Sequence, residues 1–187
     1  MGKFNKVSQD TFKELQLEAG LVLNKFNPAG ETDVEDADIV CATTGGIEIA
    51  CKPEFVDYAE DIDNVPPGMI EFKEISSYEC TIAFTALNAS AEVIKLALGA
   101  ADVSDGKITP RFNTSKDDTE DIWWVGERAD GGFVACCLKK ALSTEGLTLK
   151  STKNGKGQIS CTLTGHVSID AQDEVPMEFY VMEGEPA

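Results

Sequence analysis

The sequence contains a single histidine and no CxxC pair, and both absences limit its chemistry. A serine, histidine and aspartate triad needs side chains that converge from separate segments, whereas Ser168 and Asp170 follow His166 on one predicted strand. Zinc sites usually combine cysteine pairs with further cysteine or histidine ligands. We therefore expect no catalytic residues, no metal site and no cofactor, and we predict that the protein is not an enzyme.

Basic residues are also few. Lysine and arginine number 16 against 33 aspartates and glutamates, which gives a formal net charge of −17 at pH 7. Proteins that bind nucleic acid use cationic side chains to displace counterions from phosphates. The charge balance argues against DNA or RNA as a ligand, and any contact with DNA is expected to be weak.

Long apolar runs are missing as well. No run approaches the roughly 18 residues that cross a bilayer, and residues 1–15, MGKFNKVSQDTFKEL, lack the apolar core of a signal peptide. We expect synthesis in a cytoplasm, with the six cysteines reduced and buried. The length of 187 residues favours one domain, residues 1–187.

Most of the chain instead alternates apolar and polar residues with a period of two, which is typical of strands with one buried face. In the first such segment, the side expected to face the core carries Leu15, Leu17, Ala19, Leu21 and Leu23. A long loop at about 27–44 and a long hairpin at about 46–87 follow. Helical spacing occurs at about 90–99, between a serine N-cap and a glycine stop. The predicted fold is mainly β, an antiparallel sandwich or barrel with one flanking α-helix.

Two tryptophans and two adjacent cysteines fall within a second predicted hairpin, residues 121–144. Neighbouring strand residues face opposite sides, so Cys136 and Cys137 are not placed to share a metal. Neither has a nearby histidine or helix N-terminus to lower its pKa, which argues against an enzyme with a cysteine nucleophile. By the same alternation one of Trp123 and Trp124 lies outside, and we expect Trp124 to be exposed at an interface.

The acidic turn at residues 57–64 leaves another function open. Its carboxylates and Asn64 supply oxygens of the kind that bind calcium. Val65, however, stands where an EF-hand pattern requires an oxygen ligand, and the glycine and closing glutamate spacing also differ. A solvated turn is favoured, and the alternative is an acidic β-sandwich module that binds calcium and carbohydrate.

Five stretches, in order, resemble the major tail tube proteins of long-tailed, non-contractile bacteriophages. They are DIVCATTGGIEIACKPEFVDYAEDIDN, GKITPR, DIWWVGE, GGFVACCLKKALST and NGKGQISCTLTGHVSIDAQDEVPMEFYV. The likeness extends from about Leu15 to Val181, and the Trp-Trp strand followed by the TGH and DAQD run makes it specific. It implies a β-sandwich that forms hexameric rings, stacked around the tape measure protein into a tube that later conducts the DNA genome. Contractile tails and tail-like particles share this architecture and remain alternatives.

The resemblance also implies partners and a location. The partners are other copies of the chain, the tape measure protein, and the tail tip and tail terminator proteins, while DNA crosses the lumen without specific binding. The location is the virion tail, assembled in the host cytoplasm without membrane anchoring. Loop length and aromatic exposure give these subunit-interface candidates: Thr32, Asp33, Thr43, Thr44, Asp57, Tyr58, Asp61, Asp63 and Trp124. Polar strand faces give these lumen-facing candidates: Glu48, Lys52, Glu54, Glu79 and Thr81.

Overall fold

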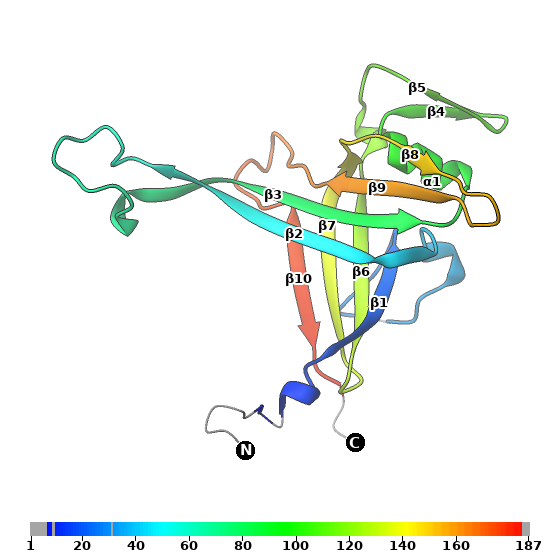
Figure 1. Cartoon of the computed structure of the whole chain (residues 1–187), viewed down its shortest axis with the longest axis horizontal. Helices are drawn as coiled ribbons and strands as arrows, with labels where there is room; N and C mark the ends of the chain where they lie inside the picture. The colour runs from blue at the N-terminus through cyan, green and yellow to red at the C-terminus, as the bar shows by residue number, and fades with distance from the viewer. Residues whose placement is uncertain (1–6, 9, 31, 185–187) are drawn as a thin grey trace.

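The computed structural model describes residues 7, 8, 10–30 and 32–184, and nearly all of its strands join in one antiparallel network (Figure 1). The strand order is β1-β6-β7-β9-β3-β2, with β10 beside β7 and β8 beside β9. A separate two-stranded sheet pairs β4 (Ala101–Ser104) with β5 (Lys107–Pro110). The prediction of a mainly β, antiparallel fold with one flanking helix is confirmed. The bounds of the network strands are β1 Gln16–Leu23, β2 Thr43–Asp57, β3 Lys73–Ala86, β6 Glu120–Arg128, β7 Phe133–Ser143, β8 Thr148–Lys150, β9 Gln158–Thr164 and β10 Met177–Met182.

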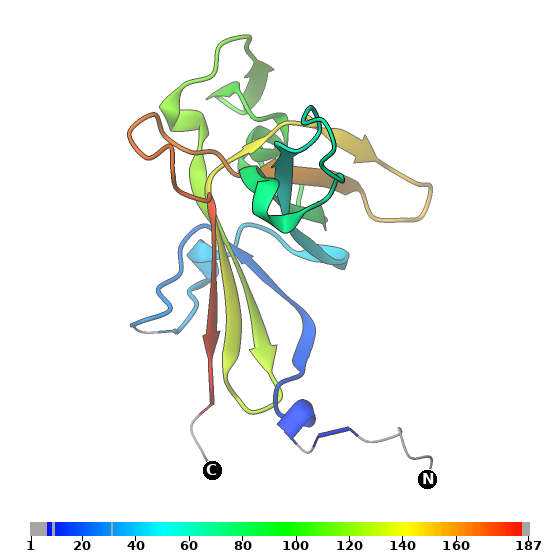
Figure 2. The ribbon, with the colours of Figure 1, turned by 90° about the vertical axis from the view of Figure 1, so that its left-hand side faces the viewer.

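One bent strand, β7, belongs to both layers of the fold. Residues 133–138 of β7 pair with β6 and β10, whereas Leu142 and Ser143 pair with β9. Between them Lys140 has a φ of 47°, and its N–H donates to Asp121 Oδ1 at 2.9 Å. The bend divides the network into a β1 layer (β1, β6, β7, β10) and a β2 layer (β2, β3, β8, β9), which cross steeply in Figures 1 and 2. Strand bends of this kind make the corners of orthogonally packed sheets.

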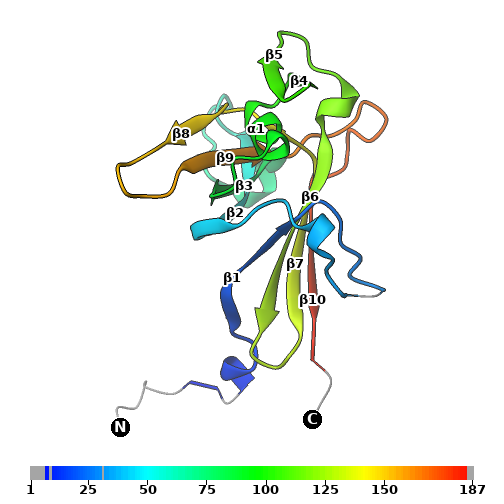
Figure 3. The ribbon, with the colours of Figure 1, turned by 90° about the vertical axis from the view of Figure 1, so that its right-hand side faces the viewer.

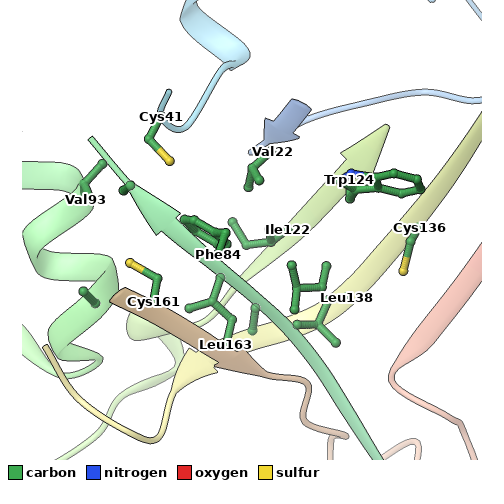
Figure 4. Packing of buried hydrophobic residues seen from close by; sticks show 14 of the residues in the cluster. Val22, Cys41, Phe84, Val93, Ile122, Trp124, Cys136, Leu138, Cys161 and Leu163 are labelled. Atoms are coloured by element: carbon green, nitrogen blue, oxygen red, sulfur yellow. The ribbon is translucent and has the colours of Figure 1, made fainter. Parts of the chain in front are cut away.

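The core fills the space where the two layers cross (Figure 4). Ile122 and Leu138 of the β1 layer face Phe84 and Leu163 of the β2 layer, and all four are buried. Helix α1 (Ala91–Leu98) packs against β9 (Figure 3) and buries Val93 and Ala97. It lies within the predicted 90–99, because the Ser90 hydroxyl accepts from the Val93 N–H at 3.3 Å and Gly99 ends it with a φ of 78°.

Strand β1 departs from the expected alternation. Val22 and Leu23 are both buried, while Leu17 and Leu21 are exposed, so the prediction that all the leucines face the core is wrong. The register against β6 shifts between Leu17 and Leu21, where Gly20 has a φ of 74°. A Cβ at Gly20 would lie 2.4 Å from the Val125 carbonyl oxygen. The bulge therefore needs glycine and interrupts the period of two.

The β2–β3 hairpin continues well beyond the core as an arm, defined here as residues 52–79 (Figures 1 and 2). Asp57 organises its tip, because its carboxylate accepts from the N–H groups of Ala59 at 3.0 Å and Gly68 at 3.1 Å. The Tyr58 N–H donates to the Phe72 carbonyl at 2.9 Å. Among the described residues, no helix is long and apolar enough to cross a membrane.

Candidate functional site

Trp124 lies in the core, so the prediction that it is an exposed interface residue is wrong. Its side chain is 9% exposed, and its indole N–H donates to the Ala19 carbonyl at 2.9 Å. The two tryptophans do face opposite sides, as alternation requires. The inward side of β6 is the one that carries Ile122 and Trp124, which leaves Trp123 on the outer side.

The chain itself covers Trp123. Phe26, from the loop after β1, lies edge-on to Trp123 with ring centroids 5.8 Å apart, and Tyr180 of β10 lies 5.7 Å away. The Tyr180 hydroxyl donates to Glu178, which also pairs with Lys139. The hydrogen bond from Lys139, joined by that from Tyr180, lowers the pKa of the Glu178 carboxyl. This outer face is therefore closed by the loop and by a polar cluster.

The arm carries an apolar face that nothing in the described chain covers. The side that is buried at Cys80 and Ile82 continues outward along β3 to Tyr78 and along β2 to Phe55. Ile75 lies opposite Phe55, because the register shifts between Glu54 and Phe55. Phe55 is 56% exposed and Ile75 is 42% exposed. The β2 layer thus presents core-type residues beyond the point where the β1 layer ends.

A second uncovered apolar face lies on β10. Met177 pairs with Leu138 on the core side, and the same side continues through Phe179 and Val181. These two side chains are 56% and 61% exposed, although Met177 is buried. Strand β10 pairs only with β7 within the described chain, so its far edge is a free strand edge. The sequence alternation of β10 placed these residues on one face but could not show where the core stops.

The five predicted lumen residues share one outer face of the β2 layer. Lys52 pairs with Glu79. Thr81 pairs with Ala50, which lies between Glu48 and Lys52 on the same side of β2. The face continues into β9, where Thr164 lies opposite Thr81. Glu48, Lys52, Glu54 and Glu79 are exposed and Thr81 is half-buried. The register brings the five together, and their place in a lumen stays a prediction.

The other predicted interface residues fall in three regions. Thr32 and Asp33 are exposed in the loop after β1, of which Glu31 lies outside the described residues. Thr43 and Thr44 are half-buried at the root of β2, opposite Ala86 and Thr85. A third group lies at the arm tip, where Asp57 is held in the turn and the others are exposed: Tyr58, Asp61 and Asp63.

The acidic turn does not form a cation site in this structure. Both carboxylate oxygens of Asp57 accept backbone N–H groups, as described above. Among the residues that the structure describes, no group of three or more histidine, cysteine, aspartate or glutamate side chains is arranged to hold a metal ion. The geometry gives the calcium-binding alternative no support.

The thiols are protected by burial. All six cysteines are free, and five are buried while Cys51 is half-buried. Burial, with a smaller contribution from neighbouring groups, raises the pKa of Cys136 and of Cys137 to about 12. The histidine ring is half-buried elsewhere, with Nδ1 3.3 Å from the Lys140 carbonyl oxygen. A thiol with so high a pKa is a poor nucleophile near neutral pH.

Alkylation gives a direct check of these thiols. At pH 8 in iodoacetamide, Cys136 and Cys137 of the folded protein are expected to react roughly a thousandfold more slowly than free cysteine, because thiolate is scarce at a pKa of about 12. In denaturant all six should react at ordinary rates. Peptide mass mapping over time measures both. Fast labelling of either residue in the folded protein would restore the cysteine enzyme as a candidate.

The distinctive features of this chain are thus two uncovered apolar faces, free strand edges and one polar outer face. The arm and β10 carry the apolar faces. Strands β2 and β10 each pair with one partner in the described network. No protein-family model matches the chain, and no curated protein matches it.

Proposed function

We propose that the protein is the tube subunit of a long, non-contractile bacteriophage tail. In this proposal its copies form hexameric rings that stack around a tape measure protein, and the tube later conducts the DNA genome. The observation that carries the proposal is the pair of apolar faces, on the arm and on β10, that run past the core without cover. The confirmed fold class and the sequence resemblance are consistent with it.

Uncovered apolar faces of this kind favour association. Burying one large apolar side chain contributes about 1.5–3 kcal/mol, and folded monomers rarely expose extended apolar patches without a partner. The arm offers Phe55, Ile75 and Tyr78, and β10 offers Phe179 and Val181. These faces belong to different parts of the chain, so a contact that joins the arm of one copy to β10 of a second copy is heterologous. A heterologous contact makes a ring if its rotation closes.

The negative net charge of the protein favours conduction of DNA over binding of DNA. Each copy carries −17, so a ring of six carries roughly −100 charges, which repel phosphates. The five predicted lumen residues on the outer face of the β2 layer include Glu48, Glu54 and Glu79 against one lysine, Lys52. A lumen lined by that face would let DNA slide without adhering. The mechanism is assembly and conduction, with no catalytic step.

Negative-stain electron microscopy of the purified protein over a range of concentrations tests the proposal. Rings or hollow tubes are expected above a threshold concentration. Calcium should not raise the melting temperature beyond what magnesium does at equal ionic strength, which separates the tube from the calcium-binding alternative. A protein that stays monomeric at every concentration, and also in the presence of tail tip and tape measure proteins, would contradict the proposal.

A further inference from the structure

Positive charge is concentrated in one hairpin of this acidic protein. Residues 146–169 contain no aspartate or glutamate, although the chain has 33 of them. Within this stretch Lys150, Lys153 and Lys156 lie on the β8–β9 hairpin, residues 148–160, which we name the lysine hairpin. All three side chains are exposed, and none forms an ion pair with another described residue. The lysine hairpin is therefore a basic surface without an intramolecular partner.

The arm tip, residues 57–74, has the opposite character. It carries six carboxylates and one lysine: Asp57, Glu60, Asp61, Asp63, Glu71, Glu74 and Lys73. Of these six, Asp57 accepts hydrogen bonds from backbone N–H groups of the turn. None of the six forms an ion pair within the described chain. The arm tip is an acidic surface that also lacks a partner.

The two surfaces lie at opposite ends of the molecule. In Figure 1, viewed with the longest axis horizontal, the arm tip projects at the far left and the β8–β9 turn lies at the far right. They cannot meet within one chain, whereas the tip of one copy can meet the lysine hairpin of the next. Such a head-to-tail contact is heterologous and generates a ring or a filament.

Apolar residues accompany the charges on both sides. Tyr58, Ile62 and Ile70 are exposed at the arm tip. Leu149 is exposed on β8, beside Lys150.

We infer that the acidic arm tip of one copy docks on the lysine hairpin of a second copy, with its apolar side chains over Leu149. This inference rests on the proposed function and names one contact that joins its subunits.

A charge swap between two variants tests the contact. The first is Lys150→Glu, Lys153→Glu, Lys156→Glu, and the second is Glu60→Lys, Asp61→Lys, Asp63→Lys. Each variant alone places like charges on the two sides of the contact. The protein concentration at which it assembles in 50 mM salt should therefore rise at least tenfold. The rise should be smaller in 0.5 M salt, because salt screens the repulsion. In an equimolar mixture, the arm tip of each variant can meet a hairpin of opposite charge on the other variant. The mixture, and one chain with all six changes, should assemble within threefold of the wild-type threshold, measured by sedimentation and electron microscopy.

A matched control carries Lys25→Glu, Lys107→Glu and Lys116→Glu, which change the net charge equally at exposed sites outside the lysine hairpin. It should assemble like the wild type, and all variants should keep the wild-type circular dichroism. If the wild type assembles and both variants do so at its threshold, the inference fails while the proposed function stands. The inference also fails if the mixture of the two variants does not assemble. Loss of DNA binding in the lysine variant, with unchanged assembly, would assign the hairpin to DNA instead.

Discussion

Replacing Trp124 by alanine is expected to lower the free energy of unfolding by about 3–5 kcal/mol, the usual cost of removing a large aromatic side chain from a core. Trp124 is 9% exposed and packs between the layers with Val22 and Ile122. The change also removes the donor to the Ala19 carbonyl, which helps to hold the β1 bulge against β6. Urea unfolding followed by circular dichroism measures the loss.

The adjacent residue supplies the matched control. Trp123→Ala removes aromatic contacts with Phe26 and Tyr180 on a half-buried outer face, so a smaller loss of about 1–2 kcal/mol is expected. Trp124→Phe keeps most of the apolar contact but loses the indole donor, at about 1 kcal/mol for the hydrogen bond itself. If Trp123→Ala cost more than Trp124→Ala, the inward side of β6 would be wrongly assigned.

The tryptophan pair shows how far the sequence could be interpreted. Alternation predicts the hairpin at 121–144 and puts the two tryptophans on opposite sides of its first strand, and the structure has β6 at Glu120–Arg128. Both sides of this strand carry apolar residues, with Val125 on the same side as Trp123. Pattern alone therefore could not decide which side meets the core. In β1 the positive φ angles of Glu18 and Gly20 break the period, and the isolated Gly20 was a sequence signal of that bulge that the alternation argument did not use.

For the candidate surfaces too, the sequence predicted one part and missed another. The predicted lumen residues share one face because β2 and β3 alternate strictly from Ile47 to Cys51 and from Cys80 to Phe84. The apolar faces of the arm and β10 were missed as surfaces, because an apolar residue beyond the core has the same spacing as one inside it. Only the crossing of the two layers determines that Cys80 is buried and Tyr78, two residues away on the same side, is exposed.

Removing the arm's apolar face should prevent assembly at concentrations where the wild type forms rings. In a Phe55→Ser, Ile75→Ser variant, two side chains worth about 1.5–3 kcal/mol each on burial no longer stabilise the contact. The threshold concentration for rings or tubes is expected to rise at least 100-fold. Sedimentation velocity and electron microscopy across a dilution series measure it. Because both residues are exposed in the monomer, the free energy of unfolding should change by less than about 0.5–1 kcal/mol.

Val56 provides the control on the same arm. It is also exposed, but it alternates onto the opposite face of β2, with Glu54 and Lys52, so Val56→Ser should leave the threshold within about threefold of the wild type. An equal effect of both variants would mean that the whole arm, and not its apolar face, is the contact. Wild-type assembly by the Phe55 and Ile75 variant would remove the observation that carries the tube proposal. The contrast between the two variants separates the apolar face from the hairpin that bears it, since neither variant changes the length or the charge of the arm.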